Sequence, residues 1–255
     1  MVFLLTWFSS QHSFSQTAQS RLGIEEHLGA KLPLDLEFYD EKGFLVPLRS
    51  IVNKPTVVTF VYYRCPSVCS PLLTEVSHVI DRMGLEIGKE YQVLTISFNH
   101  HETPALSSEK KASYLNILNS PIDESGWRFM TGDSANIATL TSAAGFFFQH
   151  TGNDFVHPAA LIVISADGKI ARYIYGAQYL PFDVKMALAE ASQGRTGPTI
   201  AKVLNFCYSY DPESHAYALN VTRISGIIVV GLAGLFVFVF IVRPGRRSKE
   251  SPAKA

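Results

Sequence analysis

The feature that most constrains the fold is an apolar run that ends almost directly on a Cys-Pro pair. Residues 56–62 (TVVTFVY) are β-branched and aromatic throughout, which is typical of a strand buried on both faces. Pro66 suits the first position of a helix, where its missing N–H has no partner to lose, and apolar residues recur at helical spacing from Leu72 to Met83. The sequence therefore predicts a buried strand that turns at Cys65 into a helix ending near Gly84.

Further elements alternate along the chain on both sides of this junction. We predict a hairpin over 36–46, strands over 92–98, 146–148, 160–164 and 170–175, and helices over 105–118, from Asp133 onward, and over 181–192. This order indicates an α/β domain over residues 30–195, built on a central sheet that is covered on both faces.

A segment of different character lies near the C-terminus. Residues 224–242 (ISGIIVVGLAGLFVFVFIV) carry no charge, and at about 1.5 Å per residue they match the roughly 30 Å hydrocarbon core of a bilayer. Arg223 precedes this run, and further cations follow it at positions 243, 246, 247 and 249. We predict one C-terminal transmembrane helix over 223–243, a cytoplasmic basic tail over 244–255, and a main domain on the other side of the membrane.

The remaining segments are predicted to be connections. Residues 1–29 form a candidate signal segment and flexible lead-in: Met1–Phe8 is apolar but lacks the basic start of a typical signal, so an ordinary hydrophobic N-terminus is the alternative. Residues 196–222 form a linker, broken by Gly-Pro and Asp-Pro pairs. The chain has 22 Lys+Arg and 22 Asp+Glu, and this balance disfavours nucleic acid as a partner, because such binding requires a surplus of cations.

Two of the three cysteines stand together where the predicted strand becomes the helix. Cys65 is expected at the helix N-terminus, where unpaired amides and the helix dipole favour a thiolate, and Cys69 is expected on the same face of the first turn. This pair could hold one soft metal ion, close a disulfide, or simply pack as two inert apolar side chains. A zinc finger is disfavoured because no second Cys/His pair has the required spacing.

The eight histidines are candidates for a third metal ligand. His157 stands out because Pro158 keeps it extended at the start of the strand 160–164, but on the residues alone it remains one candidate among several. His100 and His101 are adjacent, and on an extended chain their side chains would point apart. His78 is expected on the polar side of the helix that follows the cysteines.

Two segments that are far apart in the sequence resemble the SCO/SenC family of copper-binding cytochrome c oxidase assembly proteins. Residues 60–69 (FVYYRCPSVC) are similar to the family's CPxxC segment, and residues 155–164 (FVHPAALIVI), with Asp167-Gly168, are similar to the segment that carries its histidine ligand. The resemblance covers roughly residues 30–195. It implies a thioredoxin-like sheet flanked by helices, a Cu(I) or Cu(II) site held by Cys65, Cys69 and His157, and a disulfide between the two cysteines when metal is absent.

The resemblance also implies a function and a place. We expect a copper metallochaperone that assists assembly of a cytochrome c oxidase copper site, with an oxidase subunit or another copper chaperone as its partner. A C-terminal anchor, rather than an N-terminal one, favours a bacterial cytoplasmic membrane with the main domain in the periplasm. Asn99-His100 stands where the family often has Asp-Pro, so an acidic group near the metal is not expected there.

Other functions use the same residues or the same fold. A membrane-anchored thiol–disulfide oxidoreductase that reduces cysteines of a copper-receiving partner would need Cys65 and Cys69 as its redox pair, but not His157. A thiol peroxidase is less favoured, because no set of polar residues that would position a peroxide is visible. A structural membrane protein with an inert ectodomain is less favoured to a similar degree. Cys207 is expected to be a packed or membrane-proximal thiol.

Overall fold

The computed structural model describes residues 22–65, 69–152 and 154–197, the backbone of 208–211 and 216–219, and a few positions between 229 and 236. The chain divides into two compact units, residues 1–197 and 198–255. The first contains all the strands of the largest sheet; the second contains a short hairpin formed by β12 (Tyr208–Asp211) and β13 (Ala216–Leu219).

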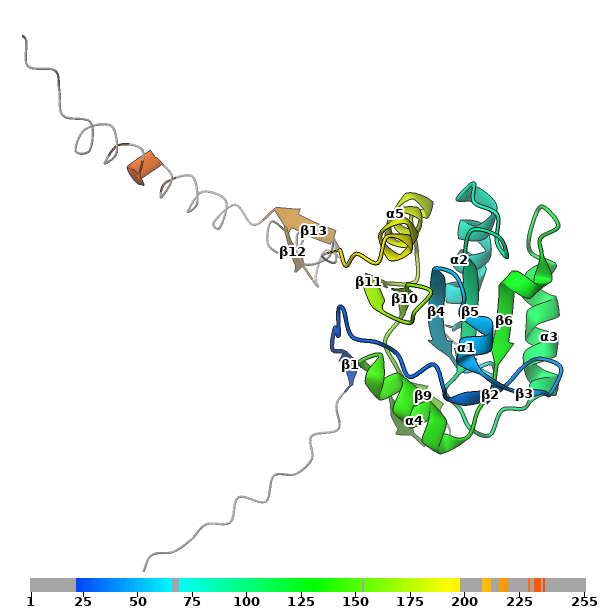
Figure 1. The fold of residues 1–255 in the computed structure, drawn as a ribbon. Helices are drawn as coiled ribbons and strands as arrows, with labels where there is room; N and C mark the ends of the chain where they lie inside the picture. The colour runs from blue at the N-terminus through cyan, green and yellow to red at the C-terminus, as the bar shows by residue number, and fades with distance from the viewer. Residues whose placement is uncertain are drawn as a thin grey trace, which may run out of the picture. The chain divides into compact units, whose positions relative to one another are not determined.

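A five-stranded sheet forms the centre of the first unit, in the order β11-β10-β4-β5-β6 (Figure 1). β4 (Thr56–Val61), β5 (Gln92–Ser97) and β6 (Trp127–Met130) are parallel to one another. β10 (Ala160–Ile164) runs antiparallel to both β4 and β11 (Ile170–Tyr175). Every residue of β4, β5 and β10 is buried, which explains why their sequences lack the alternation of a half-exposed strand.

One face of this sheet is covered by helices. α2 (Cys69–Arg82) and α5 (Pro181–Ser192) meet three strands around a small apolar space lined by Val57, Val93, Leu161, Val76, Ile80, Met83 and Val184. α3 (Pro104–Leu115) packs beside α2 and against β6. Because α2 and α3 each connect one parallel strand to the next, the carboxyl ends of β4 and β5 lie at the same edge of the sheet.

The opposite face is covered by shorter elements. They are β1 (Gly23–Ile24), β2 (Glu37–Tyr39), β3 (Leu45–Pro47), α1 (Leu48–Ile51), α4 (Ser134–Ala143) and β7 (Phe146–Phe147). Phe60 points to this face, because its parity along β4 is opposite to that of Val57, and its ring centroid lies 5.0 Å from that of Phe146. A short hairpin, β8 (Gln149–Thr151) and β9 (Asp154–Val156), follows β7.

Most of the predicted elements are confirmed, often to within a residue or two. The Asp133 side chain accepts hydrogen bonds from the amides of Ala135 and Asn136 and so caps α4, as predicted. The predicted start of the cysteine helix stays a prediction, because the residues between Cys65 and Cys69, where the described part of α2 begins, lie outside the described ranges. Pro66, on which that prediction rested, lies outside the described residues.

The predicted transmembrane helix falls almost wholly outside the described residues. Among the positions that are described, no helix is both long and apolar enough to span a bilayer. The predictions for residues 1–21 and for Cys207 also concern parts of the chain that the structure does not describe.

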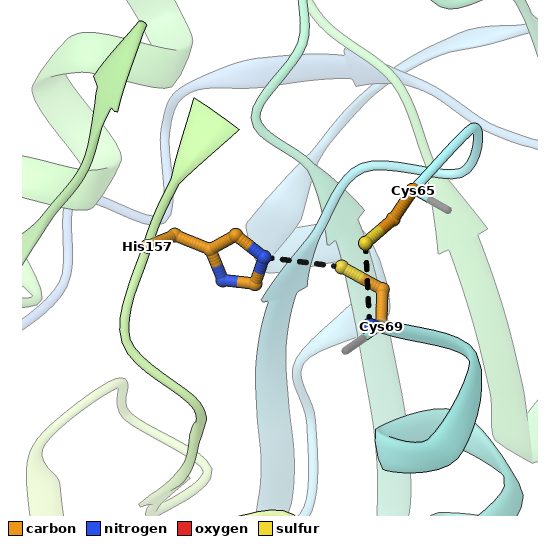
Figure 2. A group of neighbouring side chains, drawn as sticks. All are labelled: Cys65, Cys69 and His157. Carbon is orange, nitrogen blue, oxygen red and sulfur yellow. Dashed lines mark hydrogen bonds between the residues drawn. The ribbon is translucent and has the colours of Figure 1, made fainter. Parts of the chain in front are cut away.

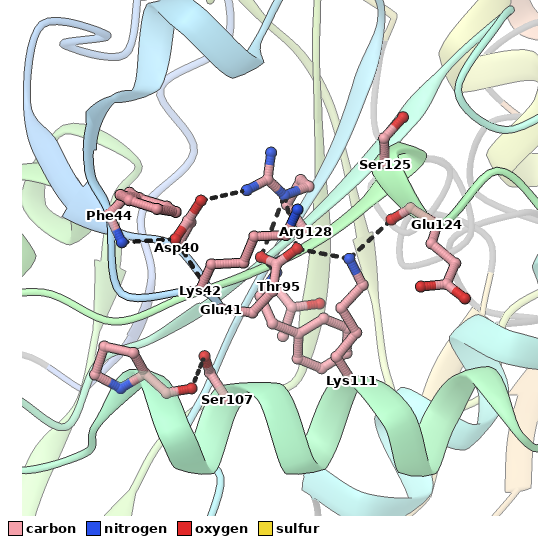
Figure 3. Close-up of polar contacts among 12 residues, drawn as sticks. Asp40, Glu41, Lys42, Phe44, Thr95, Ser107, Lys111, Glu124, Ser125 and Arg128 are labelled. Atoms are coloured by element: carbon pink, nitrogen blue, oxygen red, sulfur yellow. Dashed lines mark hydrogen bonds and ion pairs between the residues drawn. The ribbon is translucent and has the colours of Figure 1, made fainter.

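A network of buried charges joins the β2–β3 turn to α3 and β6 (Figure 3). Lys111 Nζ lies 2.6 Å from Glu41 Oε1 and donates 2.9 Å to the carbonyl of Glu124, which begins the 3-10 turn η1 (Glu124–Gly126). Arg128 donates to both Glu41 oxygens and, at 3.0 Å, to Asp40. Burial opposes ionisation of Glu41, but the two cations outweigh it and hold the pKa of this carboxyl below its ordinary value.

Replacing Glu41 with glutamine is expected to destabilise the domain by about 2–4 kcal/mol at pH 7, because the buried Lys111 and the half-buried Arg128 lose their anion. Since the pKa of Glu41 is lowered by folding, its contribution is complete above the unfolded value of about 4.3 and is lost as the pH falls further. Denaturant unfolding should therefore show a deficit that shrinks between pH 5 and pH 3. An equal deficit at pH 3 and pH 7 would contradict the ionic assignment, and Glu109→Gln, at an exposed position on α3, is the control.

Candidate metal centre

Cys65 lies in a tight turn at the carboxyl end of β4. Its amide donates 3.2 Å to the carbonyl of Tyr62, and the residue is 9% exposed. Cys69 is the first residue of α2, and its amide donates to the sulfur of Cys65 at 3.4 Å. An amide in the first turn of a helix has no partner within the helix. The Cys65 sulfur therefore takes the place of a capping group and receives the positive end of the helix dipole, which favours its thiolate.

His157 reaches the cysteines from a distant part of the chain. It lies between β9 and β10, and the antiparallel pairing of β10 with β4 brings the start of β10 to the edge where β4 ends. Its Nε2 lies 3.3 Å from Sγ of Cys69 (Figure 2). The two sulfurs and one imidazole nitrogen all lie within 4.8 Å of one another. The structure thus brings together all three predicted site residues.

The hydrogen bond of the other ring nitrogen determines which nitrogen of His157 carries the proton. Nδ1 of His157 lies 3.0 Å from the carbonyl oxygen of Pro158. A carbonyl only accepts, so Nδ1 carries the proton and Nε2 directs its lone pair towards the sulfur. Metal-binding histidines are commonly held in this way through their second nitrogen. The Pro158 carbonyl is thus the orienting partner of the imidazole, which the sequence did not indicate.

Aromatic rings pack against the imidazole, which is half-buried. Its centroid lies 5.1 Å from that of Phe98, 5.9 Å from that of Tyr62 and 6.4 Å from that of Phe146. Burial lowers the pKa of His157 below its ordinary value, while the Pro158 carbonyl and the charge of Asp154 act in the opposite direction. The ring is therefore neutral at pH 7, which is the form that binds metal.

The thiol of Cys69 is less exposed to solvent than the imidazole of His157. Cys69 is 3% exposed, and burial raises the pKa of its thiol well above the usual range, with the neighbouring Cys65 and Glu102 adding to the shift. Cys65 and Cys69 are not joined by a disulfide in the structure, so the disulfide remains a prediction. A metal ion that bound here would displace the proton of Cys69, because the thiolate is the ligand.

A buried acid holds the backbone just before Cys65. The side chain of Glu102 is 7% exposed and accepts the amides of Tyr63 at 2.7 Å and Arg64 at 2.8 Å. Glu102 is not among the site residues predicted from the sequence, and no acidic group was expected at positions 99–100. A signal existed in the Glu102-Thr103-Pro104 run, which places an acid one residue before a helix cap.

The β8–β9 hairpin that leads to His157 is attached to the site by one side-chain bond. The Tyr62 hydroxyl donates to Asp154 on β9, while the rings of Tyr62 and Phe155 lie 5.2 Å apart. Burial raises the pKa of Tyr62 above its ordinary value, and the bonds to Asp154 and Cys65 raise it further. The hydroxyl therefore stays protonated and keeps donating at physiological pH.

We expect Tyr62→Phe to loosen this hairpin without unfolding the domain. Losing one hydrogen bond of ordinary strength should raise the opening equilibrium of β8–β9 about fivefold. Amide hydrogen exchange at the paired residues Gln149 and Val156 would report it. Tyr175→Phe, which removes a similar bond to Glu26 elsewhere, should leave these rates unchanged; unchanged rates in Tyr62→Phe as well would refute the attachment.

The other histidines that the structure describes lie apart from this centre. His78 bonds Glu75 on α2, as its polar position predicted, and His150 lies against Phe155 on the exposed hairpin. The prediction for His100 and His101 was wrong: their ring centroids are 3.9 Å apart, because the chain turns here, with the Glu102 amide bonded to the Asn99 carbonyl. Within the described ranges, Cys65, Cys69 and His157 form the one cluster of three or more metal-donor side chains.

The sheet order and this centre define the class: a thioredoxin-like α/β domain with two thiols and one imidazole at the edge of its sheet. The chain belongs to the SCO1/SenC family, whose model matches residues 26–190. A relative from Bacillus subtilis, described as a SCO1 protein homolog, is 24% identical over 165 residues, covering 60% of this chain and 81% of that protein.

Solved structures share this fold. An Aquifex aeolicus protein is 29% identical with a TM-score of 0.59, covering 65% of this chain and 95% of that one. Arabidopsis thaliana ScoI, crystallised with copper bound, has a TM-score of 0.52 at 15% identity, covering 62% and 96% of the two chains. This second likeness concerns the fold alone.

Proposed function

We propose that this chain binds one copper ion through Cys65, Cys69 and His157 and delivers it to a copper site of cytochrome c oxidase. The observation that carries the proposal is the convergence of two sulfurs and one neutral imidazole nitrogen within 4.8 Å, from two segments far apart in sequence. Thiolates favour Cu(I), whereas imidazole also suits Cu(II), so the donor set fits copper in either state. A Sco relative crystallised with copper bound adds support.

The chemistry of uptake follows from the protonation of the ligands. Each thiol that binds copper releases its proton to solvent and becomes a thiolate, while the neutral imidazole needs to lose none. Three protein ligands leave room for another donor. A sulfur of the recipient can therefore enter the site before a protein thiolate leaves, which moves the ion without ever releasing it into water.

Thiol–disulfide exchange is the second candidate function, and one observation favours it. The Cys65 sulfur accepts the first helical amide of α2, an arrangement that promotes thiolate attack on a disulfide. In that reaction Cys65 and Cys69 would lose two electrons and two protons to the recipient's disulfide and form their own. The orientation of His157 by Pro158 has no part in it, which is why copper binding is the first choice.

The proposal places this domain on the outer side of a bacterial cytoplasmic membrane. The support comes from the uncharged run 224–242 and the cations that follow it. A recipient site in the same membrane would then be within reach of the linker 196–222.

Transfer to a recipient tests the function. The chain, loaded with one equivalent of Cu(I), is mixed with an apo oxidase domain that carries a dinuclear copper site, in its reduced and its disulfide forms. Copper should move to the reduced recipient, and His157→Ala should deliver less copper in the Cu(II) form, because this variant does not hold Cu(II) tightly. Reduction of the disulfide form with no metal moved to either form would favour the oxidoreductase.

A further inference from the structure

Glu102 lies next to the turn that carries Cys65, and both of its carboxylate oxygens accept hydrogen bonds. Oε2 accepts the Tyr63 amide at 2.7 Å and the Ser97 hydroxyl at 2.6 Å, and Oε1 accepts the Arg64 amide at 2.8 Å. Ser97 and Tyr63 are themselves buried. Burying a carboxylate is costly unless its oxygens are satisfied, so a buried acid with three donors is a specific construction rather than a solvated surface group.

The amides that Glu102 binds belong to the turn that carries Cys65. In this turn the Cys65 amide donates to the carbonyl of Tyr62, and the amides of Tyr63 and Arg64 donate to Glu102. The carboxylate reaches these two amides from the β5–α3 loop. The backbone of Cys65 is thereby tied to β5, while its sulfur is tied to the first amide of α2.

We propose that Glu102 is a positioning residue of the copper site: it fixes the backbone that presents Cys65, and its negative charge favours Cu(II) over Cu(I). The effect of the Glu102 charge depends on the total charge of the copper site. Two thiolates with Cu(I) carry a net negative charge, and with Cu(II) they carry none. A buried anion nearby therefore disfavours the reduced complex more. The proposal rests on copper binding at Cys65, Cys69 and His157.

The test uses the full chain carrying Cys207→Ser, which removes the one cysteine outside the centre, and compares Glu102→Gln with Glu109→Gln. Glutamine keeps the shape but loses the charge and one acceptor, whereas Glu109 is an exposed acid on the next helix. Changes in groups that orient ligands typically cost 10–100-fold in metal affinity. We expect a loss in this range for Cu(II) in Glu102→Gln, with a smaller loss for Cu(I).

A difference between the losses of Cu(II) and Cu(I) affinity shifts the reduction potential of the bound copper. If the two losses differ tenfold, the Cu(II)/Cu(I) potential of Glu102→Gln rises by about 59 mV, a shift that a purely structural role would not produce. Ser97→Ala removes one hydrogen-bond donor from the carboxylate of Glu102 but leaves both amide bonds. The negative charge is then less compensated, so the Cu(II)/Cu(I) potential of this variant should fall below that of wild type. Equal potentials in wild type, Glu102→Gln and Ser97→Ala would overturn the electrostatic part of the proposal.

A metal-free measurement separates this proposal from the function on which it rests. In the apo protein, Glu102→Gln should speed hydrogen exchange at the amides of Tyr63 and Arg64 at least tenfold relative to Glu109→Gln. Unchanged exchange in a folded variant would overturn the positioning role. If Glu102→Gln does not fold, Glu102→Asp, which keeps the charge but shortens the reach, must show the faster exchange. Failure of wild type to bind copper would instead remove the proposed function.

Discussion

Cys69→Ser is expected to lower the affinity for Cu(I) roughly 10²–10³-fold. Four-ligand structural zinc sites of thiolates and imidazoles, taken as a guide to magnitude, release about 10–16 kcal/mol on binding, or roughly 3–4 kcal/mol for each ligand, and every 1.4 kcal/mol is a factor of about ten. Cys69 is buried, and its sulfur lies 3.3 Å from Nε2 of His157, so no solvent donor can easily replace it. Competition against a chromophoric Cu(I) chelator measures the change.

Serine is similar to cysteine in size, so the variant should fold. Cys207→Ser is the matched control, since it removes a thiol from outside the centre and should leave the affinity within about twofold of wild type. Stoichiometric, tight binding that survives in Cys69→Ser would show that this thiol is not a ligand.

His157→Ala is expected to separate the two candidate functions. Loss of the imidazole should abolish tight binding of Cu(II), because two thiolates alone provide no ligand suited to the oxidised ion. Cu(I) should remain bound, because the two thiolates that favour it are still present. Thiol–disulfide exchange by Cys65 and Cys69 should continue at a similar rate. Electron paramagnetic resonance of Cu(II)-loaded protein and a disulfide-exchange assay measure these properties on one sample.

His150→Ala provides the control for that variant. His150 is exposed on β8, seven residues from His157 in the same hairpin region. Its loss should change neither the Cu(II) spectrum nor the exchange rate. If both histidine variants kept a wild-type Cu(II) spectrum, the centre would be a redox pair beside an uninvolved histidine.

The elements that place the cysteines were predictable because their signals are local. The run 56–62 became β4, fully buried, and the helical spacing from Leu72 became α2. The meeting of His157 with Cys69 depends on the pairing of β10 with β4, which links residues about a hundred positions apart. No local pattern encodes that pairing. The resemblance to a known family pointed to it, and the structure then supplied the contact.

What the sequence missed has a common physical cause. The edge strand β6 is only four residues long and includes Arg128, whose charge is compensated by Asp40 and Glu41 from another element. Glu102 looks like a solvated loop acid until the turn at Cys65 offers it two amides. In both cases a distant partner lets the polar side chain leave the solvent, fully at Glu102 and partly at Arg128, and the hydrophobic pattern of the sequence does not show such a partner.

The central claim is that two sulfurs and one imidazole nitrogen bind a single copper ion. X-ray absorption spectroscopy of the chain loaded with one equivalent of copper, in the Cys207→Ser background, counts these donors directly. The expected result is two sulfur scatterers and one imidazole in the wild type, with the imidazole signal lost in His157→Ala. A copper shell with fewer than two sulfurs, or one that His157→Ala leaves unchanged, would contradict it.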